Sequence, residues 1–304
     1  MTAEPQQPPS PPTPAVHPGP AHPGTVRPRA VRTRRIAFAY PPGSLDRHYV
    51  QGDLVMSHVV AVLSALFPEG EDYFVRAVRK HADLVTDPEL RSQVRGFIGQ
   101  EVTHGREHRG LNDRLRWMGY PTRLVDRFTH YLMIRPDRVF PDRFQLAVTA
   151  ALEHYTATIA ERLLSSPGAQ RLLGESEVRS ILLWHALEES EHKTVAFDVF
   201  RETGGGETLR INTMRLVNTL FVPIVVGLTT ISLAGDRAAY NPLRLLRSLA
   251  ALRHNPFLDR EMLEHVRAYN RRGFHPDDAD ATALVERWKV ELFGDDGRLA
   301  DHLR

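Results

Sequence analysis

Two stretches indicate how this chain folds: GQEVTHGREH at residues 99–108 and WHALEESEHKTVAFDV at residues 184–199. Each contains the pattern Glu-x-x-His, which on an α-helix puts both side chains on one face, about one turn apart. In a chain with 15 histidines, two such patterns are unremarkable by count. Their positions relative to the bends of the chain are therefore what the prediction depends on.

The sequence around these motifs predicts helices and bends, with no alternation typical of strands. Helix-length segments are expected at 46–66, 71–85, 88–118, 122–133, 142–165 and 175–202. Asp87 is a good capping residue and Pro88 suits the first position of a helix, so a first bend is expected at 86–87. Ser-Ser-Pro-Gly at 165–168 indicates a second bend, before residue 175. We therefore predict an all-α fold.

Each Glu-x-x-His motif has a lone glutamate at a similar height in its helical hairpin. Glu71 lies about fifteen residues before the first bend and Glu101 about fourteen after it. Glu153 lies about twelve residues before the second bend and Glu189 about fourteen after it. At roughly 1.5 Å per residue, both members of each pair are expected at the same level of the bundle.

Helix bundles that hold two metal ions use this arrangement, a glutamate from each of two helices and Glu-x-x-His from each of the other two. Four carboxylates can neutralise two divalent ions, whereas the same groups buried without a metal would repel one another. The sequence therefore predicts a di-metal four-helix core over residues 36–204. The ligands predicted from the register are Glu71, Glu101, His104, Glu153, Glu189 and His192.

Three further side chains lie near this predicted site. His185 shares a helical stripe with Glu189 and His192, at spacings of four and three, and is expected to be a third imidazole ligand. Glu188 occupies almost the same angle as Glu189 and is the alternative ligand; Glu189 is preferred because it completes a Glu-x-x-His pattern. His108 lies one turn beyond the first motif, either as a ligand or as the hydrogen-bond partner of one.

These segments resemble known families. The ligand pattern is similar to that of the ferritin-like di-iron carboxylate proteins, and with its third histidine it looks like the arylamine N-oxygenases of that class. The phrases PEGEDYF, GQEVTHGREH, ALEHYTA and WHALEESEHKTVAFDV resemble a bacterial family described as predicted metal-dependent hydrolases, over roughly residues 35–300. The resemblance implies a ferritin-like four-helix bundle with additional N- and C-terminal helices, and it supports the ligand set.

Several functions fit a site of this kind. The main prediction is a non-haem di-iron oxidase or oxygenase that uses O₂, with an external electron donor, on a small organic substrate. By family analogy that substrate is aromatic. Two metal ions are the expected cofactors, Fe first, with Mn or Zn as alternatives. The alternative functions are a di-metal hydrolase of an ester or phosphate, and a non-catalytic membrane-associated protein that binds metal.

Composition excludes other chemistries. The chain has no cysteine, so disulfides, thiolate ligands, iron–sulfur clusters and a cysteine nucleophile are excluded, and any metal must be held by nitrogen and oxygen. The sequence lacks a Gly-x-Ser-x-Gly elbow, a P-loop, a dinucleotide fingerprint and His-Glu-x-x-His. The formal net charge is only +2, which gives no support to a nucleic-acid partner.

Residues 1–35 are rich in proline and arginine and contain no apolar run typical of a secretory signal. This composition predicts a disordered tail. The alternative is a basic arm that binds nucleic acid or an anionic membrane. Without a signal and without cysteine, a cytoplasmic location is expected.

Residues 205–304 are predicted to be a helical extension of the core. Within them, LVNTLFVPIVVGLTTISLAG at 216–235 carries no charge over a length that could cross a bilayer. Pro223 and Gly227 weaken a membrane-spanning interpretation. Membrane contact, a buried helix and a contact within a homo-oligomer stay open, and a homo-oligomer is expected. Two amphipathic helices are predicted over 257–293.

Overall fold

The structure, a computed structural model, describes residues 30–304, without the side chains of residues 136 and 137. Over this range the fold is helical, and extended segments pair only in an isolated antiparallel bridge between Ile36 and Leu303. The predicted all-α bundle is confirmed. Most of the predicted N-terminal tail, residues 1–29, lies outside the described residues.

Four long helices carry the predicted ligands: α1 (Leu54–Ala82), α2 (Pro88–Trp117), α4 (Asp142–Ser165) and α6 (Glu177–His192). α1 packs mainly on α2 and α4 mainly on α6. The additional helices are α3 (Thr122–Val139), α5 (Pro167–Leu173), α7 (Val195–Glu202), α8 (Glu207–Ala234), α9 (Pro242–Ala251), α10 (Arg260–Ala268) and α11 (Thr282–Phe293), with short 3₁₀ turns at Arg237–Tyr240, Leu252–His254, Pro276–Asp278 and Ala300–His302.

The predicted bends arise from local capping. Asp87 accepts hydrogen bonds from the backbone N–H groups of Glu89 and Leu90, and Pro88 occupies the first position of α2. Ser166 accepts a hydrogen bond from the backbone of Ala169 and starts α5 in the same way. The bend between α1 and α2 therefore lies where the sequence predicts it.

Two predicted helix boundaries are wrong. The segments 46–66 and 71–85 belong to one helix, α1, because Pro68 is accommodated inside it where α1 packs closely on α2. Gly105 of α2 lies opposite Pro68, where a Cβ would be in ordinary van der Waals contact with Pro68 Cα, at 3.7 Å. The segment 175–202 is divided into α6 and α7 around Lys193, whose ammonium donates to Glu161 and to a backbone carbonyl.

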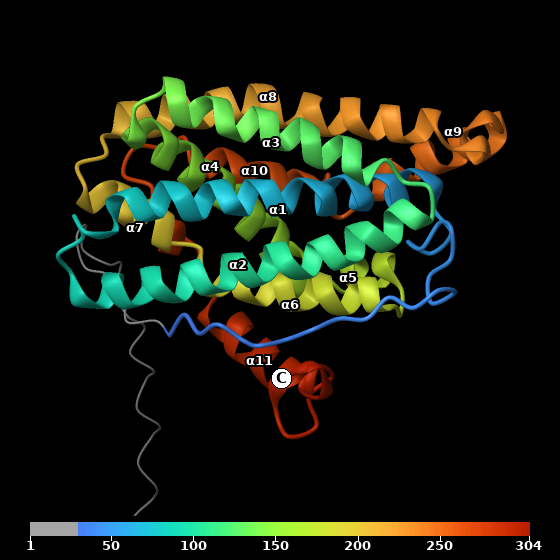
Figure 1. Cartoon of the computed structure of the whole chain (residues 1–304), viewed down its shortest axis with the longest axis horizontal. Helices are drawn as coiled ribbons and strands as arrows, with labels where there is room; N and C mark the ends of the chain where they lie inside the picture. Colours follow the sequence, from blue (N-terminus) through green and yellow to red (C-terminus); the bar gives the residue numbers. More distant parts are fainter. Residues whose placement is uncertain (1–29) are drawn as a thin grey trace, which may run out of the picture.

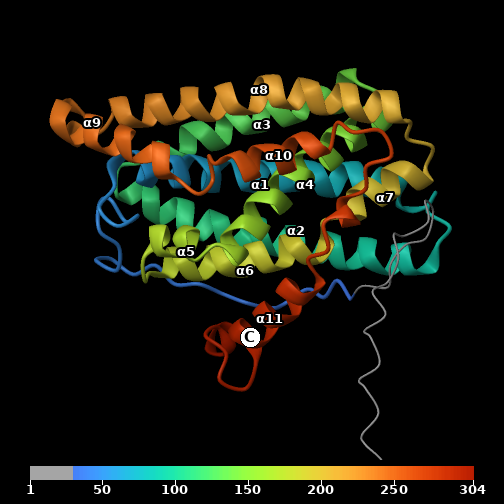
Figure 2. The ribbon, with the colours of Figure 1, turned by 180° about the vertical axis from the view of Figure 1, so that it is seen from behind.

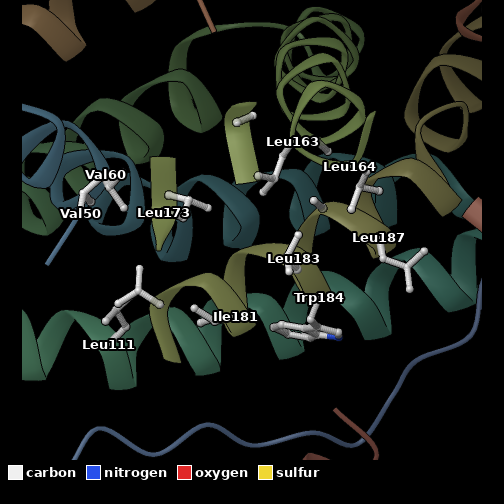
Figure 3. Packing of buried hydrophobic residues seen from close by; sticks show 14 of the residues in the cluster. Val50, Val60, Leu111, Leu163, Leu164, Leu173, Ile181, Leu183, Trp184 and Leu187 are labelled. Atoms are coloured by element: carbon white, nitrogen blue, oxygen red, sulfur yellow. The ribbon is translucent and has the colours of Figure 1, made fainter. Parts of the chain in front are cut away.

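A cluster of buried apolar side chains holds α6 between its neighbours (Figure 3). Ile181, Leu183, Trp184 and Leu187 of α6 pack there, with Leu111 of α2 among the residues they meet. Fully burying one leucine side chain contributes roughly 1.5–3 kcal/mol. This packing fixes the helix that carries the densest set of candidate ligands.

The helices of the C-terminal region cover opposite sides of the bundle (Figures 1 and 2). α8 and α3 lie along one side of α1, α9 follows at the end of α8, and α11 lies on the opposite side of the molecule. Among the described residues, two helices are long and apolar enough to cross a membrane, α1 and α8. The apolar window of α1 is 67% buried and that of α8 is 22% buried, so α1 is a core helix and α8 exposes most of its apolar surface.

Candidate metal centre

The four long helices bring the predicted ligands together inside the bundle. All seven side chains are buried, with exposed fractions between 0 and 4%. They are Glu71 from α1, Glu101 and His104 from α2, Glu153 from α4, and His185, Glu189 and His192 from α6. Burial of so many ionisable groups at one level requires a compensating charge.

These side chains form two groups, in each of which the candidate ligand atoms lie within 4.8 Å of one another. The groups consist of Glu71, His104 and His185, and of Glu101, Glu189 and His192. Glu153 adjoins the second group, since its Oε2 lies 3.4 Å from His192 Nε2. Two neighbouring groups of this kind have the shape expected for two metal ions.

Glu189 lies between the two groups. Its Oε1 is 2.8 Å from His185 Nε2 and 3.7 Å from His104 Nδ1, both in the first group. Its Oε2 is 3.4 Å from His192 Nε2 in the second group. A carboxylate with one oxygen toward each group is positioned to bridge two ions.

Most carboxylate oxygens of this centre have no hydrogen-bond donor among the described residues. Both oxygens of Glu71, Glu101 and Glu153 are buried without one, and so is Oε2 of Glu189. A buried carboxylate without donors loses its hydration uncompensated, at a cost on the order of several kcal/mol. A cation supplies the missing partner, because carboxylate oxygen is a ligand for divalent metals. The donor set therefore fits a metal centre.

His192 directs Nε2, the nitrogen available to a metal, toward the carboxylates. Gln100 Nε2 donates to Glu191 Oε2 at 2.9 Å and to the carbonyl oxygen of Arg32 at 3.2 Å, which fixes the orientation of the amide. Gln100 Oε1 is then an acceptor 2.9 Å from His192 Nδ1, so Nδ1 carries the proton. The other nitrogen, Nε2, lies 3.1 Å from Glu101 Oε1. Two acceptors this close need a positive charge between them.

His104 also turns its free nitrogen toward Glu189, but this nitrogen is Nδ1, and Glu188 instead of Gln100 fixes the ring. Its Nε2 lies 3.0 Å from Glu188 Oε2, and Glu188 Oε1 accepts from Arg34 at 2.9 Å. A carboxylate paired with arginine accepts hydrogen bonds, so His104 Nε2 carries the proton. Nδ1 has no hydrogen-bond partner among the described residues and faces Glu189.

A chain of three side chains, Asn112, Ser64 and His108, orients His185. Asn112 Nδ2 donates to the carbonyl oxygen of Ser64 at 2.9 Å, so Asn112 Oδ1 accepts from the Ser64 hydroxyl at 2.8 Å. Ser64 Oγ must then accept a hydrogen bond from His108 Nδ1, at 2.9 Å. His108 Nε2 is therefore unprotonated and accepts a hydrogen bond from His185 Nδ1, at 2.8 Å. Nε2 of His185 keeps its lone pair and faces Glu189.

These hydrogen bonds bear on two choices that the sequence left open. Glu188 binds Arg34 and His104 outside the two groups, whereas Glu189 lies between them, so the geometry favours Glu189 as the ligand. His108 supports His185 from behind and is not placed among the carboxylates. Partners of this kind fix the tautomer and the ring orientation of a metal-binding histidine.

Burial and crowding displace the pKa values of the carboxyl groups. Burial, with neighbouring carboxylates, raises the pKa of Glu71 and Glu101 well above the ordinary value and that of Glu153 to about 7. Burial acts in the same direction on Glu189, but His192 and His185 outweigh it and hold its pKa well below the ordinary value. Burial lowers the pKa of His192, but Glu189 and its neighbours outweigh this and raise it. The centre therefore attracts positive charge.

An extended N-terminal arm, residues 30–40, lies along the bundle beside α2 and α6 (Figure 1). Gly96 and Gly99 of α2 leave room for it, because a Cβ at Gly96 would lie 2.1 Å from the carbonyl oxygen of Val31 and one at Gly99 2.0 Å from Thr33 Oγ1. The prediction of a disordered tail up to residue 35 is therefore wrong for residues 30–35, since helix packing orders them.

The arm contributes a residue that the sequence analysis missed. Arg34 donates to both oxygens of Glu191 at 2.7 Å and to Glu188 at 2.9 Å. Gln100 was missed as well, although it directly precedes Glu101 in the first motif. The only signal for Arg34 was the pair of glycines on one face of α2, which is weak evidence without a partner segment.

A second buried cluster, formed by His48, His58 and Asp236, also has the residue types of a metal site. In this cluster, unlike the first, imidazole N–H groups point toward the carboxylate. Arg244 donates to His48 Nδ1 at 2.8 Å, so His48 Nε2 carries a proton and donates it to Asp236 Oδ2 at 3.0 Å. His58 Nε2 also meets Asp236 Oδ2, at 3.1 Å, and Ser232 bonds the other nitrogen of His58. This cluster satisfies itself without a metal.

A family model described as a predicted metal-dependent hydrolase matches residues 32–280, which include all four helices of the centre and the arm from residue 32. The chain belongs to this family. The comparisons with curated proteins and with solved structures found no match. Membership in a metal-dependent family agrees with the buried clusters of histidine and acid, and it confirms the resemblance seen in the sequence.

The family description also corrects the predicted activity. The main prediction, a di-iron oxidase or oxygenase that needs O₂ and an electron donor, is wrong, because the family is described as hydrolytic. The family description points to a hydrolase and not to an oxidoreductase. Oxidases and hydrolases of this type share carboxylate and imidazole ligands, so the ligand pattern could not separate them.

Proposed function

We propose that this protein is a hydrolase that works with two divalent metal ions held inside its four-helix bundle. One observation carries the proposal: the hydrogen-bond partners of His104, His185 and His192 place each proton on the nitrogen that faces away from the two groups of candidate ligands. Histidines that bind a metal require this orientation. The family description supports hydrolysis as the reaction.

The two groups divide the ligands between two ions. Glu71, His104 and His185 would hold one ion, Glu101, Glu153 and His192 the other, and Glu189 both. Four ionised glutamates balance the charge of two divalent ions. Nitrogen and oxygen donors suit Zn, Mn and Fe alike, so all three belong in the test.

Bound ions of this kind lower the pKa of water and polarise an ester or phosphate. The residues of the chain decide where that chemistry occurs. Gln100, Glu188 and His108 keep the three imidazoles in place, and the apolar packing of α6 keeps bulk water out. We propose a small ester or phosphate as the substrate.

Hydrolysis without oxygen is the direct test. Protein stripped of metal with a chelator would be reloaded with Zn²⁺, Mn²⁺ or Fe²⁺ and assayed anaerobically on p-nitrophenyl acetate and bis-p-nitrophenyl phosphate. We expect turnover with at least one metal, loss of turnover after chelation, and its return on reloading. Two bound ions per chain without hydrolysis of either ester type would refute the hydrolase and leave the metal centre intact.

A further inference from the structure

Helices α8 and α9 expose a row of large apolar side chains, here called the docking face. Their exposed fractions range from 43 to 75%. The docking face consists of Leu216, Leu220, Val222, Val226 and Ile231 of α8 and Leu243, Leu246 and Leu249 of α9. Apolar surface gathered in this way on a soluble fold marks an interaction site.

The opposite side of α8 is fixed to the bundle. Its buried residues include Met214, Val217 and Leu228, which belong to the apolar clusters of the core. Ser232 lies 2.6 Å from His58 Nδ1 of α1. A helix attached along its length to α1 and α4 cannot cross a bilayer, so α8 can only lie along a surface.

The exposed charges of the segment that carries the docking face are of one sign. Between Thr208 and Leu258 the chain has six arginines, no lysine and a single acidic residue, Asp236; one of the arginines, Arg210, is buried and paired with Glu207. Asp236 is buried and is already bonded to histidines and to Arg47. Arg237 and Arg247 are exposed. The surface that this segment offers is therefore apolar with a basic border.

We infer that the docking face binds the surface of an anionic phospholipid bilayer. The leucine, valine and isoleucine side chains enter the boundary between headgroups and acyl chains, and the arginines contact lipid phosphates. Arginine suits this position because its aliphatic stem stays with the apolar layer while the guanidinium reaches the headgroups.

A second copy of the chain fits the docking face less well than a bilayer does. A two-fold contact places the same patch of both chains together. The arginines at both ends of the uncharged segment would then face arginines, with no exposed acidic residue from Thr208 to Leu258 to pair with them. An anionic bilayer supplies the missing negative charge.

Vesicle sedimentation tests this inference on the full chain. We expect binding to vesicles of phosphatidylcholine mixed with phosphatidylglycerol, and binding at least about tenfold weaker to phosphatidylcholine alone or at high salt. Val226→Glu should weaken binding to the mixed vesicles by about tenfold or more, because it places a charge in the apolar layer. Arg237→Glu combined with Arg247→Glu should do the same through the headgroups.

Val290→Glu is the matched control. Val226 and Val290 are both exposed helical valines, at 59 and 70%, but Val290 lies on α11, on the other side of the molecule. Its substitution should leave vesicle binding unchanged, and all variants should keep the metal content of the unchanged protein. Equal binding by the Val226 and Val290 variants would overturn the inference. So would sedimentation without lipid in which the unchanged protein is a dimer and Val226→Glu a monomer.

Discussion

Two buried clusters of histidine and acid lie in this bundle, and they differ in the direction of their hydrogen bonds. Around Asp236, imidazole N–H groups point inward to the carboxylate, and each neighbouring group finds a partner. Around Glu189, the three imidazoles point their N–H groups outward, and most carboxylate oxygens are left without a donor. Proximity alone gives both clusters the appearance of metal sites. The surrounding donors and acceptors separate them.

The largest expected effect is on metal binding. His192→Ala removes a ligand from the Glu189 cluster and leaves buried carboxylates to repel one another, so metal affinity should fall by more than about 100-fold. His58→Ala removes an imidazole from the Asp236 cluster and should leave two metals per chain. Competition against a chelator measures both. Equal losses in the two variants would abolish the distinction between the clusters.

Adjacent glutamates on α6 sharpen the comparison further. Glu189→Ala removes the carboxylate between the two groups, whereas Glu188→Ala removes only the partner of His104. We expect Glu188→Ala to lower metal affinity by about tenfold to 100-fold and Glu189→Ala to lower it further. Metal analysis of both proteins after the same purification decides the order. A greater loss from Glu188→Ala would exchange their roles.

Asp236→Asn tests the cluster that needs no metal. The amide weakens the contacts with Arg47, His48 and His58 and should lower the free energy of unfolding by about 1–3 kcal/mol. Metal content should not change. Urea denaturation of the metal-loaded protein measures the loss. If metal leaves the variant before it unfolds, the two clusters are coupled and the comparison fails.

Displacing the N-terminal arm should have a smaller effect on metal affinity. Gly96→Ala pushes a Cβ against the backbone of Val31 and should displace Arg34, with roughly a tenfold loss in affinity. Gly110→Ala is the control on the same helix, because a Cβ there meets nothing within 4 Å and alanine favours the helix. Chelator competition should separate the two variants. Identical affinities would show that the arm does not support the centre.

The pH dependence of stability gives the smallest and most diagnostic effect. In metal-free protein the pKa of Glu153 is raised from 4.5 to about 7, so its stabilising contribution is present below pH 4.5 and is lost as pH rises through 7. Glu71 and Glu101 shift in the same direction. We expect these carboxyl groups to lower stability by on the order of 1 kcal/mol per pH unit in this window, whereas His104 and His108, whose pKa values burial lowers, act oppositely as pH rises to 6.5. Asp236, whose pKa is lowered, acts oppositely and loses its contribution as pH falls below 3.8.

Denaturation of metal-free and metal-loaded protein at several pH values checks this sign. Bound metal removes the dependence, because the carboxylates then stay ionised in the folded protein. Glu153→Gln isolates the carboxyl contribution: if the metal-free variant has the same pH dependence from about pH 5 to pH 7 as the unchanged metal-free protein, the crowding of the Glu189 cluster is contradicted.

The sequence was sufficient where local rules and helix register apply. Asp87 and Pro88 marked the bend, and counting residues from it predicted that Glu71 and Glu101 lie near each other; the structure has them in the two neighbouring groups. It was insufficient where tertiary contacts decide. The segments 46–66 and 71–85 were predicted as separate helices, yet Pro68 between them lies inside α1, which packs on α2. Arg34 lies in a segment whose composition predicts disorder, and the contact of this segment with α2 orders it.

The choice of reaction was also beyond the sequence. Carboxylate and imidazole ligands serve oxidative and hydrolytic enzymes alike, and nothing in Glu101, His104 or their counterparts on α6 distinguishes the two. Glu188 and Glu189 could not be separated by helical angle either. The partner of each carboxylate, Arg34 in one case and the paired imidazoles in the other, distinguishes them in the structure.

The arm meets the other end of the chain. The backbone of Ala37 donates to the carbonyl of His302, and the backbone of Arg304 donates to that of Arg35. Residues synthesised after all the helices of the bundle therefore secure a segment synthesised before them, directly beside Arg34. A growing chain cannot complete this clasp until residues 302–304 have been made, so the arm is secured only after every helix that carries a candidate ligand.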